Sequence, residues 1–266
     1  MSSLPKLVAT DLDGTLVRTD GTVSAHSHEV LARLRANGVA LVGATGRGPR
    51  LIELTRANLG PADYLVLAQG GFCYDLTGTA PELLYSRTLP GTMVAKAVSL
   101  VEAEAGPVYL AVEAGTEPLA PLWTDPDFAW PYPEPAEHRP RAMALRGPLV
   151  KAFLRSDTLT LDELLAVCRR VLPATMCEVS RTVGMLELAP PGCTKATGLA
   201  MITEALGVDP GDVLAFGDMP NDVPMLRWVG RAIAVANAHP EVLAVADDVT
   251  ASNDEDGVAA YLEKLL

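Results

Sequence analysis

With 266 residues, the chain is long enough for one large domain or two modest ones, each with its own hydrophobic core. Hydrophobic residues make up 49% and charged residues 20%, and the apolar runs are far shorter than the roughly 18 residues that a membrane span needs, so we expect a soluble protein with no membrane partner. The net charge of −12 and the lack of a long basic run argue against nucleic acid as a partner, and a start without a secretory or transit signal predicts a cytoplasmic location.

The first 80 or so residues alternate short apolar runs with helical patterns. The predicted strands are Leu7–Thr10, Val39–Ala44 and Tyr64–Ala68, and the predicted helices are His28–Arg35 and Arg50–Leu59. Apolar strands separated by helices are typical of a parallel sheet that is covered on both faces. The pattern predicts a doubly wound, Rossmann-like α/β core domain, with residues 1–82 as its first part.

From about Leu83 to Leu188 the pattern changes to that of an α+β segment. Its predicted strands are Leu83–Ser86, Val108–Val112, Leu149–Leu154, Thr175–Ser180 and Gly184–Leu188, and its predicted helices are Thr92–Ala105 and one that opens with a capping box at Thr160 and Glu163. The stretch Pro118–Pro140 holds seven prolines, a density that predicts no regular element. Its aromatic residues indicate that this stretch packs on a neighbouring surface.

The parallel pattern resumes after this segment. The predicted helices are Lys195–Leu206, Val223–Trp228, Glu241–Ala246 and Gly257–Leu265, and the predicted strands are Val213–Phe216 and Ala232–Val235. Residues 189–266 are therefore expected to complete the core domain, with residues 83–188 as a second domain inserted into it.

Two acidic clusters follow predicted strands. Asp11 and Asp13 come directly after the first strand, and residues two apart on an extended chain point to the same face, at the carboxyl edge where open α/β sheets bind ligands. Asp218 and Asp222 follow a later strand and should reach the same crevice. Carboxylates gathered there repel one another unless a hard cation lies among them, and oxygen ligands favour Mg²⁺. The alternatives are a solvated Asp-Gly turn and ordinary helix capping.

Two further segments fall at helix starts. Thr45 and Gly46 end the second strand, where a hydroxyl and a backbone N–H group can clamp a phosphate oxygen. Lys195 opens a helix, a position where the helix dipole disfavours positive charge, so an anion nearby is expected. For Thr45 and Gly46 the alternative is a simple turn with a solvated Arg47, and for Lys195 it is an exposed lysine.

Together these segments resemble a known family. They read Asp11-Leu12-Asp13-Gly14-Thr15-Leu16, Thr45-Gly46-Arg47, Lys195 and Gly217-Asp218-x-x-Asn221-Asp222, similar to the four motifs of the haloacid dehalogenase superfamily of phosphatases. The chain looks like the Cof-type branch, which carries a large C2-type cap between the second and third motifs. It departs from that branch at Gln69-Gly70-Gly71, where Asn-Gly-Ala is usual, and at Ala196, where glycine is usual.

The resemblance implies a Mg²⁺-dependent phosphatase that hydrolyses small phosphate monoesters, such as sugar phosphates, through an aspartyl-phosphate intermediate. It implies that Asp11 is the nucleophile, Asp13 the general acid and base, and the cap the source of specificity. The residues implied to hold Mg²⁺ are Asp11, Asp13 through its main-chain carbonyl, Asp218 and Asp222. The residues implied to hold the phosphate are Leu12, Thr45, Gly46, Lys195 and Asn221. The expected partner is a small phosphorylated metabolite, and the expected state a monomer or weak homodimer.

Other functions on the same core remain open. A phosphotransferase would use the same aspartates, but phosphomutases resemble the subclass with a cap between the first two motifs, and the 33 residues between Asp11 and Thr45 leave no room for one. A dehalogenase would have no use for the acids at Asp13, Asp218 and Asp222. A regulator that binds a phosphometabolite without turnover would not need the full set of catalytic acids.

Overall fold

The computed structural model describes residues 4–117, 119–182 and 184–266, so Pro118 of the predicted proline-rich stretch lies outside the described residues. The chain forms two compact units. The first ends at Arg47, resumes over Glu53–Tyr85 and is completed by Thr194–Leu266, whereas the second consists of Gly48–Ile52 and Ser86–Cys193. The second unit thus differs from the expected 83–188 at both ends, and it takes in a short segment from within the expected 1–82.

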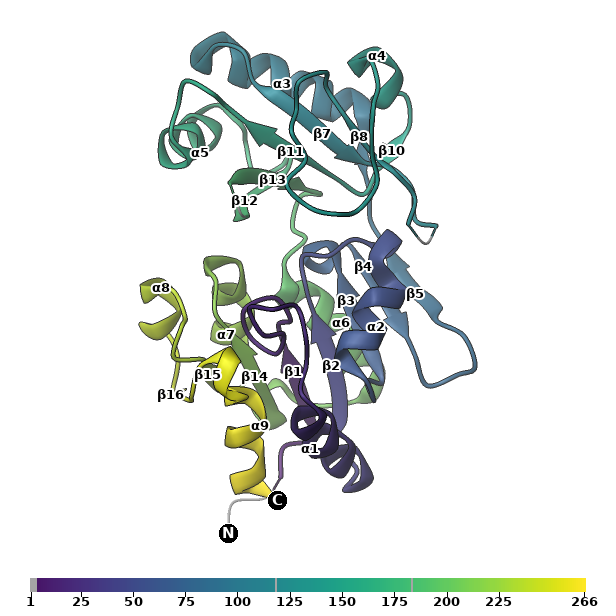
Figure 1. Cartoon of the computed structure of the whole chain (residues 1–266), viewed down its shortest axis with the longest axis vertical. Coiled ribbons are helices and arrows are strands. Elements are labelled where there is room, and N and C mark those ends of the chain that lie inside the picture. Colours follow the sequence, from purple (N-terminus) through teal and green to yellow (C-terminus); the bar gives the residue numbers. More distant parts are fainter. Residues whose placement is uncertain (1–3, 118, 183) are drawn as a thin grey trace. The chain divides into compact units, whose positions relative to one another are not determined.

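The first unit is built on a sheet that has eight strands within the described residues, in the order β16-β15-β14-β1-β2-β3-β4-β5 (Figure 1). All pairings from β16 to β3 are parallel, and β4 runs antiparallel to β3. The bounds are β1 Leu7–Thr10, β2 Ala40–Ala44, β3 Tyr64–Leu67, β4 Phe72–Asp75, β5 Glu82–Ser86, β14 Val213–Gly217, β15 Arg231–Ala234 and β16 Asp248–Val249. The predicted parallel α/β core is confirmed. Leu83–Ser86, expected in the inserted segment, forms most of β5, the edge strand of this sheet, and of these residues only Ser86 belongs to the second unit.

Helices cover both faces of this sheet. The helices are α1 Ala25–Ala36, α2 Ile52–Leu59, α6 Lys195–Leu206, α7 Val223–Trp228, α8 Pro240–Leu243 and α9 Gly257–Leu262. The crossovers β1-α1-β2 and β14-α7-β15 lead outward from the centre in opposite directions, so right-handed connections place α1 and α7 on opposite faces. In agreement, α1 packs against α9, and α7 packs against α6.

Helix α6 begins and ends where its sequence predicts. The Thr194 hydroxyl accepts a hydrogen bond from the N–H of Thr197 and caps the first turn, and Gly207 ends the helix with a left-handed φ of 64°. These two signals place Lys195 at the first position of the helix, at the carboxyl edge of the sheet.

The second unit is an antiparallel sheet with helices on one face. Its strand order among the described residues is β12-β13-β11-β7-β8-β9, with β8 and β9 parallel, and β6 and β10 form a separate pair. The strands are β6 Leu89–Pro90, β7 Tyr109–Glu113, β8 Leu122–Thr124, β9 Ala136–His138, β10 Pro148–Leu149, β11 Lys151–Arg155, β12 Glu178–Thr182 and β13 Met185–Ala189. The helices are α3 Gly91–Ala105, α4 Arg141–Ala144 and α5 Leu161–Val171, the last with the predicted capping box.

The proline-rich stretch contains regular structure, contrary to the prediction. Strands β8 and β9 are only three residues long, and each fits between two prolines, so no proline has to supply a ladder N–H group. The aromatic residues after β8 do pack, as expected. Phe128 is buried, and Trp130 lies edge-on to Phe153 of β11 with ring centroids 5.3 Å apart. The stretch therefore covers the side of the sheet opposite to α3 and α5, because Phe153 alternates with Ala152 and Leu154 of the helix-side core.

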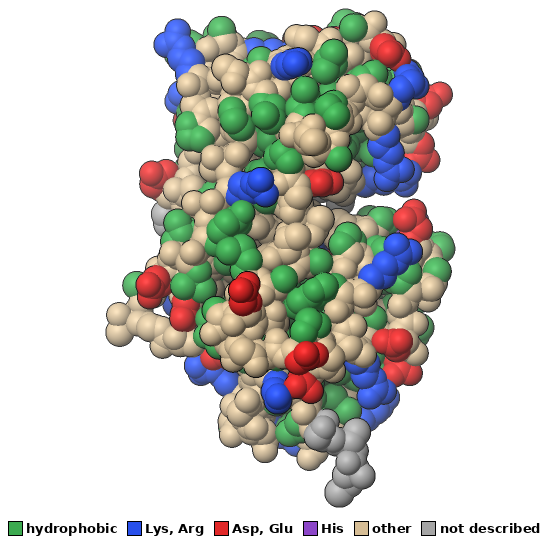
Figure 2. Space-filling model, turned by 180° about the vertical axis from the view of Figure 1, so that it is seen from behind, with side chains coloured by type: hydrophobic (Ala, Val, Ile, Leu, Met, Phe, Trp, Pro, Cys, Tyr) green, Lys and Arg blue, Asp and Glu red, His purple; other side chains and the backbone are tan. Residues whose placement is uncertain are grey.

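The surface carries charges of both signs. On the face drawn in Figure 2, the Lys and Arg side chains stand in separate groups among acidic and neutral residues rather than in one continuous basic area. Within the described ranges, every helix is too short or too polar to cross a membrane.

Candidate active site

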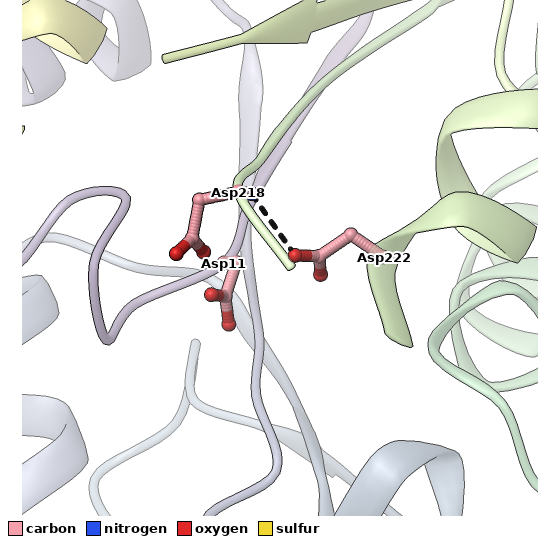
Figure 3. Close-up of side chains that lie close together, drawn as sticks. All are labelled: Asp11, Asp218 and Asp222. Atoms are coloured by element: carbon pink, nitrogen blue, oxygen red, sulfur yellow. Dashed lines mark hydrogen bonds between the residues drawn. The ribbon is translucent and has the colours of Figure 1, made fainter. Parts of the chain in front are cut away.

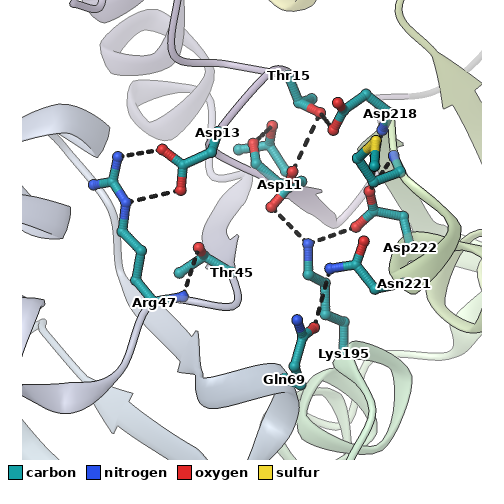
Figure 4. Close-up of polar contacts among 12 residues, drawn as sticks. Asp11, Asp13, Thr15, Thr45, Arg47, Gln69, Lys195, Asp218, Asn221 and Asp222 are labelled. Carbon is teal, nitrogen blue, oxygen red and sulfur yellow. Dashed lines mark hydrogen bonds and ion pairs between the residues drawn. The ribbon is translucent and has the colours of Figure 1, made fainter. Parts of the chain in front are cut away.

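Loops that follow four neighbouring parallel strands bring polar side chains to one edge of the first unit's sheet (Figure 4). Asp11 follows β1, Thr45 follows β2, Gln69 follows β3 and Asp218 follows β14. Because β14, β1, β2 and β3 are adjacent and parallel, their carboxyl ends meet at the same edge. The start of α6 adds Lys195 to this group.

Three carboxylates form the centre of the site. Asp11, Asp218 and Asp222 each offer an oxygen within 4.8 Å of the others, and all three side chains are buried (Figure 3). The N–H groups of Asp218 and Met219 donate to Asp222 Oδ2, at 3.1 and 3.0 Å, which holds this carboxylate at the start of the turn before α7. An all-oxygen donor set of this kind suits Mg²⁺.

Lys195 is the counter-charge inside this cluster. Its side chain is 1% exposed, and Nζ donates to Asp11 Oδ1 and to Asp222 Oδ1, both at 2.6 Å. Burial by itself lowers the pKa of Lys195, but the two carboxylates outweigh burial and hold the pKa above its ordinary value. The alternative of an exposed lysine is therefore wrong. The two carboxylates are the nearby anions that we expected from the position of Lys195 at a helix start.

The pKa values of the aspartates reflect the crowding of negative charge in the site. Burial raises the pKa of Asp11 well above its ordinary value, Lys195 opposes the rise, and Asp222 and Asp218 add to it. Burial and the charge of Asp222 likewise raise the pKa of Asp218. One lysine among three carboxylates leaves two negative charges uncompensated, which is the charge that a divalent cation balances. The residues therefore fit a magnesium ion both in donor type and in charge.

Asp13 does not join this cluster, which corrects the expectation that its carboxylate points the same way as that of Asp11. Its side chain is 58% exposed and accepts two hydrogen bonds from Arg47, at 2.9 Å from Nε and 2.5 Å from Nη2. The reason is local: β1 ends at Thr10, and Gly14 turns the chain with a φ of 87°, so the alternation of an extended strand no longer applies. Arg47 is correspondingly bound to Asp13 rather than solvated.

The proposed phosphate-binding residues surround the carboxylates. Thr45 is 1% exposed, and its Oγ1 accepts a hydrogen bond from the N–H of Arg47 at 3.1 Å. Asn221 Nδ2 donates to Gln69 Oε1 at 3.2 Å. Gly46 continues the turn from Thr45, and the Leu12 side chain lies in the core, which leaves its main chain at the sheet edge.

Two contributors were missed from the sequence. Thr15 Oγ1 donates to Asp218 Oδ1 at 2.9 Å and lies 3.5 Å from Asp11 Oδ2, so it links two of the three carboxylates. Asn237 Nδ2 donates to the carbonyl of Gly14 at 2.8 Å and so holds the loop that carries Asp13. Thr15 stands within the first motif, which was a usable signal, whereas the contact of Asn237 joins it to a residue 223 positions away in the sequence and is set by the tertiary structure.

Comparison with known proteins agrees with this arrangement. The chain is 28% identical to 5-amino-6-(5-phospho-D-ribitylamino)uracil phosphatase YitU of Bacillus subtilis, over 99% of this chain and 98% of that protein. Its fold matches a haloacid dehalogenase-like hydrolase from Bacteroides thetaiotaomicron with a TM-score of 0.79 at 26% identity, over 98% of this chain and 100% of the other. It also matches a protein of Geobacillus kaustophilus HTA426 with a TM-score of 0.76 at 28% identity, over 98% of each chain. The family model of haloacid dehalogenase-like hydrolases matches residues 8–262, and the chain therefore belongs to that family, as its four motifs predicted.

Proposed function

We propose that the protein is a magnesium-dependent phosphatase that hydrolyses small phosphate monoesters through an aspartyl-phosphate intermediate. The observation that carries this proposal is the buried cluster of Asp11, Asp218 and Asp222 around Lys195 at the carboxyl edge of the sheet. Such a cluster would hold a divalent cation beside a nucleophilic carboxylate. The YitU relative is named for a phosphorylated metabolite with a ribityl chain, which is a compound of the proposed substrate class.

The cation would be held by the carboxylates of Asp11, Asp218 and Asp222 and by the main-chain carbonyl of Asp13. When bound, it offsets the repulsion between a carboxylate and a phosphate dianion and stabilises charge on the transferring group. Thr45, Lys195, Asn221 and the N–H groups of Leu12 and Gly46 hold the phosphate oxygens.

The reaction divides into two displacements at phosphorus. In the first, a carboxylate oxygen of Asp11 forms a bond to phosphorus while the bond to the ester oxygen breaks, and Asp13 gives its proton to the leaving alcohol. In the second, Asp13 takes a proton from a water molecule, whose oxygen bonds to phosphorus and releases Asp11 and inorganic phosphate. General acid and base assistance of this kind is worth roughly 10²- to 10⁴-fold. The exposed position of Asp13 gives it access to both the alcohol and water.

The specificity of the reaction is proposed to reside in the inserted segment, expected at 83–188 and observed as Ser86–Cys193. The residues assigned to phosphate and metal contact no other part of a substrate, so they do not distinguish one monoester from another. Leaving-group contacts therefore have to come from elsewhere in the chain.

The test is phosphate release from an aryl phosphate and from a panel of phosphorylated sugars and polyols. We expect turnover with Mg²⁺, loss of turnover in EDTA, and a phosphorylated peptide containing Asp11 after rapid quenching. Asp11→Asn should abolish both turnover and the phosphopeptide. Absence of release from every ester in the presence of Mg²⁺ would contradict a phosphatase, and turnover by Asp11→Asn would contradict the nucleophile.

A further inference from the structure

Gln69 occupies a constrained turn at the catalytic edge of the sheet. It follows β3, is 6% exposed, and takes a left-handed backbone conformation with a φ of 57°, as does Ala68 before it with a φ of 49°. For a residue other than glycine this conformation is strained, so two in succession require support from their surroundings. Gln69 is also the sole glutamine in the chain.

Neighbouring segments supply that support. The N–H of Ala68 donates to the carbonyl of Arg47 at 2.8 Å, and the N–H of Gln69 donates to the carbonyl of Thr45 at 3.2 Å. On the other side, Gly70 packs so closely on the start of α6 that a Cβ atom there would lie 2.1 Å from the carbonyl oxygen of Thr194. The turn is therefore held in place by the Thr45 loop on one side and by α6, the helix that begins with Lys195, on the other.

The side chain of Gln69 has one end occupied. Oε1 accepts the hydrogen bond from Asn221 Nδ2 at 3.2 Å, and this bond sets the orientation of the amide (Figure 4). Through its main chain Gln69 is thus tied to Thr45, and through its side chain to Asn221, which are two of the proposed phosphate ligands. The residue lies in the phosphate-binding region without having been assigned a part in it.

The nitrogen end of the Gln69 amide carries hydrogen-bond donors. The Nε2 atom of a glutamine carries two N–H groups. Within residues 4–117, 119–182 and 184–266, no side chain or carbonyl accepts a hydrogen bond from Gln69 Nε2. Nε2 is not among the buried side-chain polar atoms that lack a partner within the described residues, so this nitrogen keeps some contact with solvent although Gln69 is largely buried. A phosphate group presents only acceptor oxygens, and the other side chains proposed to meet it, Thr45, Lys195 and Asn221, are all able to donate.

We propose that Gln69 is a further phosphate-contacting residue, whose Nε2 donates a hydrogen bond to an oxygen of the transferring phosphate. The inference rests on the proposed phosphatase function, because it concerns the same phosphate site. The bond to Asn221 holds the amide, and the strained turn holds the backbone, so the donor is in place before the substrate arrives.

Because the chain has one glutamine, the contact can be observed directly. Protein labelled with ¹⁵N in glutamine has a single side-chain NH₂ signal, which is titrated with inorganic phosphate in the presence of Mg²⁺. We expect a saturable shift of this signal, with the same midpoint as the competitive inhibition of aryl phosphate hydrolysis by phosphate. A signal that stays in place while phosphate inhibits would overturn the assignment of Gln69 and leave the phosphatase proposal standing. Failure of phosphate to bind the wild type would overturn the assignment of Gln69, whereas the phosphatase proposal is decided by release of phosphate from esters.

Two substitutions separate a direct contact from support of Asn221. Gln69→Met removes the donor and the acceptor at similar length, and we expect the inhibition constant of phosphate to rise about tenfold, as for the loss of one hydrogen bond to a charged group. Gln69→Glu keeps the acceptor for Asn221 but replaces the donor by a negative charge, so the rise should be at least as large. A Gln69→Glu variant that binds phosphate like the wild type would show that Gln69 acts only through Asn221, and overturn the proposal.

Control measurements distinguish loss of the phosphate contact from a general disturbance of the fold and from loss of a leaving-group contact. Thr203→Ala removes a buried hydroxyl that donates within α6, at the opposite end of the helix from Lys195, and should leave phosphate inhibition unchanged. Thermal unfolding checks that each variant is folded. If Gln69→Met raises KM for esters and leaves the inhibition constant of phosphate unchanged, Nε2 contacts the leaving group instead, and the assignment to phosphate is wrong.

Discussion

Removing the charge of Lys195 should destabilise the metal-free protein by several kcal/mol. Its Nζ lies 2.6 Å from both Asp11 Oδ1 and Asp222 Oδ1, with the lysine side chain 1% exposed. At an effective dielectric constant of about 20, each contact corresponds to about 6 kcal/mol of Coulomb attraction, against which stands the cost of burying the ammonium group. Removal of one partner from a buried ion pair typically costs about 3–5 kcal/mol, and we expect Lys195→Met to lose that much at pH 7.

The loss should depend on pH, with a sign set by the aspartates. The pKa of Asp11 is raised in the folded protein although Lys195 lowers it, so without the lysine this pKa rises further. At a pH above the pKa of Asp11 in the folded protein, this carboxylate is charged, and its burial lowers the free energy of unfolding. At a lower pH the carboxyl group is protonated, and this destabilisation disappears. The difference in free energy of unfolding between wild type and Lys195→Met should therefore be largest at neutral pH and shrink as the pH falls towards the ordinary aspartate value of 3.8.

Thermal unfolding in EDTA over a series of pH values measures this difference. For a chain of this size we expect the melting temperature to fall on the order of 10 °C at pH 7. Lys6→Met is the matched control, because Lys6 pairs with Asp212 at 2.8 Å but is 63% exposed, and it should leave the melting temperature unchanged. Equal stability of Lys195→Met and wild type at pH 7, or a loss of the same size at every pH, would refute the reasoning.

Three further outcomes are expected. Mg²⁺ at about 100 times its dissociation constant should raise the free energy of unfolding by about 2.7 kcal/mol at pH 7, and by less at acid pH. Scanning calorimetry measures this change, and a melting temperature that EDTA does not alter would argue against the metal site. Asp13→Asn should lower kcat by roughly 10²- to 10⁴-fold while the stabilisation by Mg²⁺ persists, and a kcat near that of the wild type would remove Asp13 from proton transfer. In the second unit, Lys151 Nζ lies 3.2 Å from Glu187 Oε2 with both side chains buried, so Lys151→Met should cost about 3 kcal/mol. In urea unfolding, the double variant with Glu187→Leu should regain part of this loss and not all of it, because the buried Glu113 also interacts with Lys151. A double variant no more stable than Lys151→Met would contradict a buried ion pair there.

Elements with strong local signals were predictable from sequence. The strand Leu7–Thr10 and the helices Lys195–Leu206 and Val223–Trp228 have the predicted bounds. The reason is that apolar periodicity, a capping threonine and a terminating glycine act within a few residues of one another. The acids of the site were also found from sequence, because they directly follow recognisable strands.

Elements that depend on partners far along the chain were not predictable. Strand β4 was missed, and β5, expected in the inserted segment, joins the first unit's sheet, since membership of a sheet is set by pairing with β3 and its neighbours. The short strands among the prolines are likewise stabilised by β7, which the local sequence does not reveal.

The sequence by itself determined which residue types stand at the ends of the strands, whereas the tertiary structure decided which of them meet. Lys195 and Asp11 are 184 residues apart and are joined only because β1 lies beside β14 in the sheet and α6 packs next to β3. Asp13, two residues from Asp11, instead turns away to Arg47. Local patterns carry the identity of a side chain, but the direction of that side chain after a strand ends depends on the turn and on the charges that the sheet order brings near it.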